Sequence, residues 1–103
     1  MSERLKKDNF DEKVFQDNQV SLIEFYSDSC VPCKRMAVVL ADLEEAYPDK
    51  LFVGKVNVAY EQELTEKYEV TSTPTFLLVK NGEIISKLSG IQKKADLEEM
   101  INS

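Results

Sequence analysis

The chain has 103 residues, of which 43% are hydrophobic and 31% charged, so we expect one globular domain spanning residues 1–103. Its 13 basic and 19 acidic residues give a net charge of −6, which disfavours binding to nucleic acids and to anionic membranes. No apolar run approaches the roughly 20 residues that span a bilayer, and no signal-peptide core follows the charged first residues, so we expect a soluble cytoplasmic protein. With two cysteines and no histidine, the sequence excludes a conventional zinc site within one monomer and catalysis by a Ser–His or Cys–His pair.

The first part of the chain predicts a short helix and then a buried strand. Residues 3–7 are too polar to predict a strand. Asn9 is a candidate N-cap, with Glu12 three residues later, for the helix that follows. The apolar side of this helix consists of Phe10, Val14 and Phe15. The segment Val20–Tyr26 is almost continuously apolar, which is typical of a central parallel strand that is buried on both faces.

A longer helix and a second strand are predicted next. From Pro32 to Tyr47 the apolar residues recur at spacings of three and four, which is the period of an amphipathic helix. The apolar stripe consists of Met36, Val39, Leu40, Leu43 and Ala46. Pro48 ends the helix, because proline cannot continue it. The segment Leu51–Val58 then predicts a second strand.

The following segments predict a short helix and a hairpin. Residues 61–69 have a helical pattern with two inward-facing positions, Leu64 and Tyr68. Two strands, residues 75–80 and 83–88, are joined by Asn81-Gly82, which is a strong signal for a two-residue hairpin turn.

A helix over Ala95–Ile101 closes the chain, with its apolar residues on one side. The predicted order is therefore helix, strand, helix, strand, helix, hairpin, helix. The first strand–helix–strand unit predicts a right-handed parallel crossover, and the hairpin adds antiparallel strands. The predicted fold class is α/β, with a central mixed sheet of four to five strands and helices on both faces.

The two cysteines form a CxxC motif, Cys30-Val31-Pro32-Cys33, between the first buried strand and the long helix. At a helix start, Cys30 lies near unpaired backbone N–H groups and the positive end of the helix dipole. Both favour the thiolate, which is the nucleophilic form of cysteine. Pro32 suits the first helical turn, where no hydrogen bond is lost. The motif therefore predicts reversible thiol–disulfide chemistry.

Two other interpretations of the cysteine pair remain open. A CxxC motif is also half of many metal sites, and on this view Cys30 and Cys33 would need ligands from elsewhere. The pair is also compatible with a stabilising disulfide, but so small a loop would contribute only about 2 kcal/mol on the chain-entropy model. Reversible opening makes better use of this spacing, because Cys33 can attack a mixed disulfide formed on Cys30.

Two segments carry a family resemblance. Phe25–Lys34 (FYSDSCVPCK) resembles the active-site segment of the thioredoxin family, usually FWAxWCGPCK, and Thr73–Glu83 (TPTFLLVKNGE) resembles the proline-containing strand and hairpin of that family. Gly90 matches a glycine that lines the substrate groove in the family. The likeness runs from about Asn9 to Ile101, so it implies the thioredoxin fold for nearly the whole chain.

The resemblance implies a role for each residue of the site. Cys30 would attack a substrate disulfide and Cys33 would resolve the mixed disulfide, so the two would form the redox disulfide. The bond before Pro74 would be cis, so that the Thr73 backbone can pair with an extended substrate strand. Without the family, a strand-initiating proline would be the better interpretation of Pro74. The full substrate-binding set implied by the resemblance is Val31, Pro32, Thr73, Pro74 and Gly90.

A charged residue interrupts the first buried strand. Ionisable residues are rarely buried unpaired, so the simplest interpretation of Glu24 is a strand-edge charge that reaches solvent. The resemblance implies another, because thioredoxins usually carry a buried Asp here that transfers a proton for the resolving cysteine. Lys55 matches the lysine that commonly accompanies this carboxyl, although a solvated strand lysine explains it equally well.

The chain departs from the family pattern at several positions, four of which bear on the groove, the reduction potential and the shape of the long helix. Tyr26 and Ser29 stand where the family usually has Trp, which predicts a less bulky and less apolar groove beside the cysteines. Val31 replaces the usual glycine between the cysteines, a position that tunes the reduction potential in the family. Val38 stands where many members have a helix-kinking proline, so a straighter helix is expected.

The function implied by the resemblance is that of an enzyme, a thiol–disulfide oxidoreductase that reduces protein disulfides by exchange. It would work as a monomer without a cofactor or metal ion, and a thioredoxin reductase would return its electrons. A glutaredoxin is the nearest rival, but the segment Ser89–Ile91 lacks the Gly pair expected after the hairpin. Two more rivals are an exported disulfide oxidase and a non-catalytic subunit with the same fold.

Overall fold

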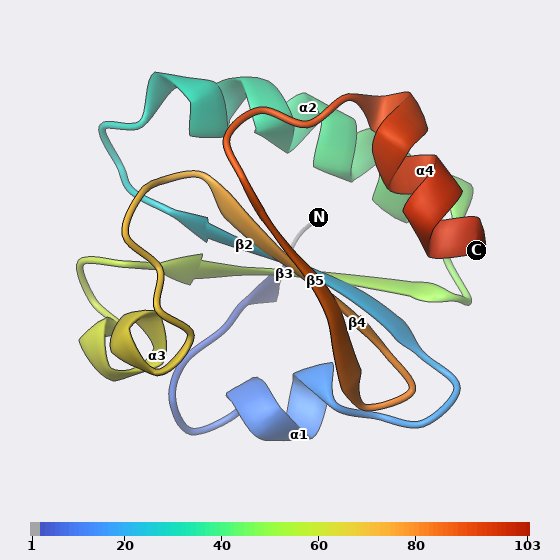
Figure 1. Cartoon of the computed structure of the whole chain (residues 1–103), viewed down its shortest axis with the longest axis horizontal. Helices are drawn as coiled ribbons and strands as arrows, with labels where there is room; N and C mark the ends of the chain where they lie inside the picture. Colours follow the sequence, from blue (N-terminus) through green and yellow to red (C-terminus); the bar gives the residue numbers. More distant parts are fainter. Residues whose placement is uncertain (1–2) are drawn as a thin grey trace.

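The computed structural model describes residues 3–103, and within them five strands form one sheet and four helices cover it (Figure 1). The strand order is β1-β3-β2-β4-β5. β1, β3 and β2 are parallel, whereas β4 is antiparallel to β2 and β5 to β4. In chain order the elements are β1 (Glu3–Arg4), α1 (Phe10–Val14), β2 (Val20–Tyr26), α2 (Val31–Ala46), β3 (Leu51–Asn57), α3 (Gln62–Lys67), β4 (Thr75–Lys80), β5 (Glu83–Ser89) and α4 (Lys94–Asn102).

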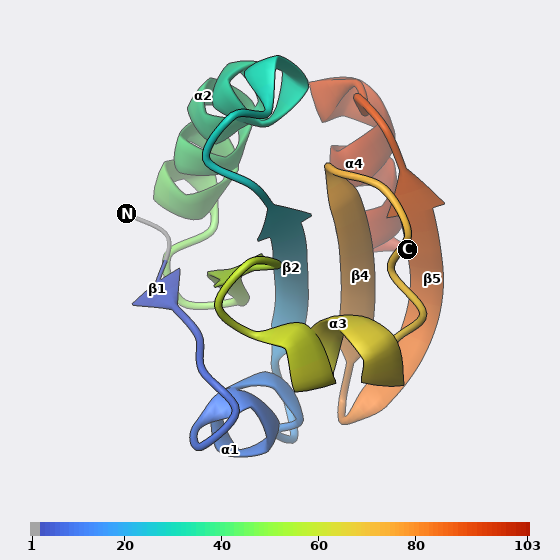
Figure 2. The same ribbon diagram turned by 90° about the vertical axis from the view of Figure 1, so that its left-hand side faces the viewer.

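The sheet separates two hydrophobic clusters. Figures 1 and 2 show α2 and α4 on one face and α1 and α3 on the other. Successive residues of β2 point to opposite faces, so Leu22 packs in the cluster under α2 and α4 while Ile23 packs in the cluster under α1 and α3. Both side chains are fully buried. The continuous apolar run of β2 is therefore explained by burial on both faces, as the sequence predicts.

The predicted elements are confirmed, with small shifts at their ends. The long helix runs without interruption over Val31–Ala46, and Val38 lies on its exposed side. The two-residue turn at Asn81-Gly82 is present, and both residues have positive φ, 50° and 80°. This is the geometry of the turn that joins right-twisted antiparallel strands. No helix among residues 3–103 is long and apolar enough to cross a membrane.

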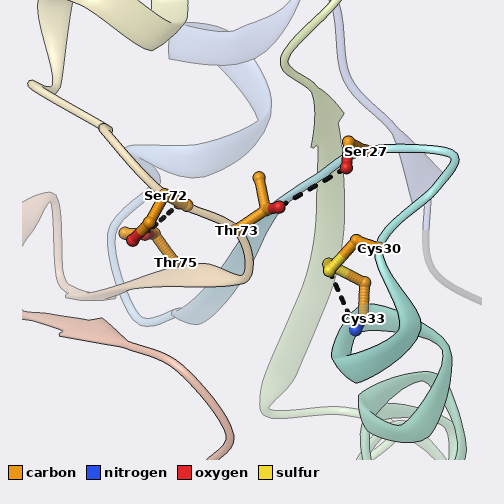
Figure 3. The surroundings of a disulfide bond; sticks show 6 residues. All are labelled: Ser27, Cys30, Cys33, Ser72, Thr73 and Thr75. Atoms are coloured by element: carbon orange, nitrogen blue, oxygen red, sulfur yellow. Dashed lines mark hydrogen bonds between the residues drawn. A yellow bond between two sulfur atoms is a disulfide. The ribbon is translucent and has the colours of Figure 1, made fainter.

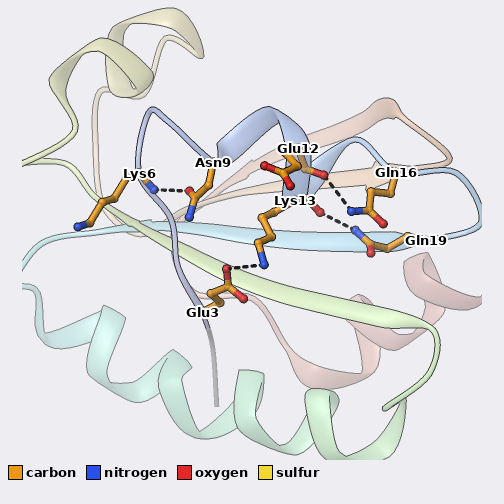
Figure 4. Close-up of polar contacts among 7 residues, drawn as sticks. All are labelled: Glu3, Lys6, Asn9, Glu12, Lys13, Gln16 and Gln19. Carbon is orange, nitrogen blue, oxygen red and sulfur yellow. Dashed lines mark hydrogen bonds and ion pairs between the residues drawn. The ribbon is translucent and has the colours of Figure 1, made fainter.

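The N-terminal segment differs from its prediction in two respects. Residues 3–7, too polar to predict a strand, include the two-residue strand β1 at the sheet edge. α1 begins where expected, with Asn9 as its N-cap residue, but the Asn9 side chain makes no capping hydrogen bond to the helix (Figure 4). Its Oδ1 instead accepts a hydrogen bond from the backbone N–H of Lys6, at 2.9 Å. The side chain therefore holds the turn before the helix, and an ion pair of 3.4 Å between Lys13 and Glu3 ties the helix to β1.

Candidate active site

The parallel strands β2 and β3 become polar where they approach the start of α2. On the α2 side of β2, the apolar positions at Val20 and Leu22 are followed by Glu24 and Tyr26. β3 changes in the same way, and its Lys55 lies in register with Glu24. This register places the ionisable groups together at the carboxyl ends of the strands. The end of a parallel sheet is where α/β proteins build their sites.

The cysteine pair caps the helix above these groups. Cys30 is the N-cap residue of α2, and Pro32 occupies its first turn. Cys30 and Cys33 form a disulfide with Cα atoms 5.3 Å apart (Figure 3). The backbone N–H of Cys33 donates a hydrogen bond to Cys30 Sγ, at 3.1 Å. After reduction the same N–H and the helix dipole favour a thiolate on Cys30.

A second loop contacts the segment that leads to the cysteine pair. The Thr73–Pro74 peptide bond is cis, as the resemblance implies. The Thr73 hydroxyl contacts the Ser27 hydroxyl at 3.4 Å, which joins this loop to the segment before Cys30 (Figure 3). The backbone N–H of Gly90 donates to the carbonyl of Pro74 at 2.8 Å, and Gly90 has a φ of +83°. Three segments far apart in the sequence therefore meet at the site.

Glu24 is buried, so its interpretation as a solvent-reaching charge at a strand edge is wrong. Its side chain is 4% exposed. Burial raises the pKa of the Glu24 carboxyl to about 7, while the nearby positive charge of Lys55 acts in the opposite direction. Glu24, Cys33 and Lys55 line one pocket of about 220 Å³ beneath the helix start. A carboxyl that titrates near neutral pH therefore lies beside the inner cysteine.

Comparison with known proteins agrees with this geometry. A sequence model of the thioredoxin family, described as "Thioredoxin", matches residues 1–103. The chain belongs to the thioredoxin family. It is 40% identical to the thioredoxin of Bacillus subtilis (strain 168) over 83 residues, which cover 81% of this chain and 80% of the relative. It is 38% identical to the thioredoxin of Alicyclobacillus acidocaldarius subsp. acidocaldarius over 93 residues, which cover 90% of this chain and 88% of the relative.

A third relative covers more of the chain. The thioredoxin of Buchnera aphidicola subsp. Acyrthosiphon pisum (strain APS) is 32% identical over 98 residues, which cover 95% of this chain and 91% of the relative. Membership of the thioredoxin family, with a cysteine pair that forms a disulfide, makes this protein a thiol–disulfide oxidoreductase. The family acts on protein disulfides, and the chain has the fold and the cysteine pair for that reaction.

Lys55 is partly buried and packs within the thioredoxin site. Its Nζ lies 5.3 Å from the centre of the Tyr26 ring, a distance at which a cation is attracted to an aromatic face. Lys55 is therefore not simply a solvated strand lysine, because part of its side chain is buried and its ammonium group lies close to the Tyr26 ring. Its charge acts on Glu24, and its ammonium group lies over Tyr26.

Polar contacts that the sequence patterns above do not predict also hold this thioredoxin site together. Asn57 is buried; its Nδ2 donates to Asp28 at 3.2 Å, and its Oδ1 accepts from the Ala59 N–H at 2.9 Å. These bonds tie the end of β3 to the loop before the cysteines. A signal was available, because Asn57 follows Lys55 by two positions and so shares its face of the strand. The partner Asp28, in contrast, depends on the path of the loop.

Proposed function

We propose that the chain reduces protein disulfides in two steps, as one domain and as a monomer. The Cys30 thiolate attacks a substrate disulfide, forms a mixed disulfide and releases the first substrate thiolate. Cys33 then loses its proton and attacks Cys30 Sγ, which forms the Cys30–Cys33 disulfide and releases the second substrate thiolate. The observation that carries this assignment is the hydrogen bond from the Cys33 N–H to Cys30 Sγ at the start of α2.

Glu24 is proposed as the group that accepts the Cys33 proton. Cys33 is buried, and burial disfavours a thiolate, so the second step needs a base. The Glu24 carboxyl lines the same pocket as Cys33. Because burial raises its pKa to about 7, the carboxylate accepts a proton more readily than a surface carboxylate does. Lys55 is proposed to keep part of this carboxyl charged at neutral pH.

The substrate is proposed to bind as an extended strand across the cis-proline loop. Val31 is exposed at the start of α2, and the backbone N–H of Gly90 donates a hydrogen bond to the carbonyl of Pro74. Together with Pro32 and Thr73, these residues form the proposed binding surface. We further propose that a thioredoxin reductase returns electrons to the disulfide and that the protein acts in the cytoplasm.

The test is a stopped-flow measurement of both steps with insulin as substrate. Cys30→Ser is expected to abolish attack, and Cys33→Ser is expected to accumulate a mixed disulfide on Cys30 that mass spectrometry detects. Glu24→Gln should leave the first step intact and slow the second about tenfold or more near pH 7. A mixed disulfide on Cys33 would contradict the assignment of the attacking cysteine. Parental rates in Glu24→Gln would make Glu24 structural only.

A further inference from the structure

Two buried polar atoms on β2 have no hydrogen-bond partner among residues 3–103. They are Glu24 Oε2 and the hydroxyl oxygen of Tyr26. Proteins pair nearly all buried polar atoms, either with each other or with ordered water. Two such atoms close together on one strand therefore indicate a shared partner rather than two separate defects.

The two residues border one pocket. Glu24 and Tyr26 are two positions apart on β2, so they share a face, and both line the pocket of about 220 Å³ that Cys33 also lines. Their Cα atoms are about 7 Å apart in an extended strand. One water molecule that makes two hydrogen bonds of about 2.8 Å at its tetrahedral angle bridges polar atoms about 4.5 Å apart. The pocket is large enough for a water molecule, which occupies about 30 Å³ in the liquid.

The charged groups around this space come from three directions. Lys55 from β3, Lys34 from α2 and Asp28 from the connecting loop line the same pocket. β4 pairs with β2 on its other side and places Phe76 opposite Glu24, so it adds no charge there. The pocket also contains uncharged side chains that can form hydrogen bonds. Of these, Tyr26 lies nearest to Glu24 along the chain. A phenol hydroxyl can donate one hydrogen bond and also accept one.

We propose that Tyr26 is a positioning residue for proton transfer at Cys33, because its hydroxyl and Glu24 Oε2 hold one water molecule between them in this pocket. This proposal rests on the proposed function. The Cys33 proton passes to the Glu24 carboxylate, directly or through this water. Cys33 Sγ then bonds to Cys30 Sγ while the bond from Cys30 to the substrate breaks, and the departing thiolate takes up the proton. The tryptophan usual in the family carries a donor N–H only, so the accepting role belongs to this chain's tyrosine.

The first test is Tyr26→Phe, which removes the hydroxyl and keeps the ring under Lys55. The pKa of Glu24 is read from the side-chain carboxyl signal in ¹³C NMR of the oxidised protein, where neither cysteine titrates. Loss of a hydrogen bond to the carboxylate should raise this pKa by about half to one pH unit. Tyr60→Phe is the matched control, because Tyr60 is 71% exposed and lies outside the pocket. It should leave the Glu24 pKa unchanged.

The second test is the pH profile of mixed-disulfide release in the same variants. In Tyr26→Phe, release should slow about threefold to tenfold at pH 7 and its profile should move to higher pH, while attack by Cys30 keeps its parental rate. A parental release profile or a parental Glu24 pKa overturns the proposal. The NMR measurement needs no turnover. If the Tyr26 assignment is wrong, the Glu24 pKa is parental in Tyr26→Phe. If the proposed function is wrong, the parent protein itself reduces no disulfide.

Discussion

At the scale of single residues, Glu24 shows a conflict between stability and chemistry. A carboxyl in the middle of a buried strand destabilises the fold whenever it is charged, because burial removes its water. An apolar residue at this position would pack against Phe76 of β4 at lower cost. The carboxyl lines the pocket beside Cys33, where we propose that it accepts the Cys33 proton. Such local conflicts are expected at functional sites.

This conflict predicts a pH-dependent gain in stability for Glu24→Gln. Below about pH 4.5 the carboxyl is protonated in both the folded and unfolded states, so the parent keeps its full stability. As the pH rises from there towards 7, the unfolded state loses its proton first, and the free energy of unfolding of the parent falls. Glutamine does not titrate, so the variant should gain about 2 to 3 kcal/mol on the parent between pH 4.5 and 8.

Urea unfolding of the oxidised proteins at a series of pH values measures this difference. Glu99→Gln, at an exposed position on α4, controls for the change in net charge. A difference between Glu24→Gln and the parent that stays constant with pH would mean that the Glu24 pKa is not raised by burial.

At the scale of elements, the sequence predicts most helices and strands because each carries a local period. The apolar run of Val20–Tyr26 and the helical stripe of residues 32–47 are examples. β1 escapes prediction because its position depends on tertiary contacts and not on a local period. Leu5, which follows it, is fully buried, and its N–H donates to the carbonyl of Lys55 at 2.8 Å. The space for Leu5 exists because Gly54 of β3 has no side chain.

Gly54→Ala is therefore predicted to loosen the attachment of β1. An added Cβ would lie 2.6 Å from Leu5 Cδ1 and 3.1 Å from Phe52 Cε2, so Leu5 must move from its buried position. We expect a loss of about 1 to 3 kcal/mol in urea unfolding. The control is a double-mutant cycle with Leu5→Ala, which removes the opposing atoms. The two losses should be strongly non-additive, and simple additivity would show that the contact does not fix β1.

The site was also partly predictable from the sequence, but for a different reason. The cysteines and Glu24 stand out in the sequence because their residue types conflict with their surroundings, a thiol pair at a helix start and a charge in an apolar strand. The hydrogen bond between Asn57 and Asp28 and the contact between Ser27 and Thr73 do not stand out. Both join segments whose proximity depends on the register of the sheet, which no local period encodes.

At the scale of the whole molecule, the site is a junction at one end of the sheet. The cysteine pair comes from the start of α2, the cis-proline loop precedes β4, and Gly90 follows β5. Figure 3 draws the cysteine pair together with Thr73 of the cis-proline loop. Exposed apolar side chains flank this junction, Val31 between the cysteines and Ile91 next to Gly90. If protein substrates dock at this junction, we expect these two side chains to contact them.

Ile91→Ser is accordingly predicted to weaken binding of protein substrates. Ile91 is 54% exposed, so a docked protein could still bury much of its surface. Loss of this apolar contact should raise KM for insulin about threefold to tenfold, which corresponds to roughly 1 kcal/mol of burial. The measurement compares KM for insulin with the rate towards a small disulfide such as hydroxyethyl disulfide, which is too small to reach across the site.

The matched control is Val38→Ser, because Val38 is 65% exposed on α2 more than a turn beyond the cysteines. An equal rise in KM in Val38→Ser, or an equal loss of rate with the small disulfide in Ile91→Ser, would mean that the surface around Gly90 does not select protein substrates.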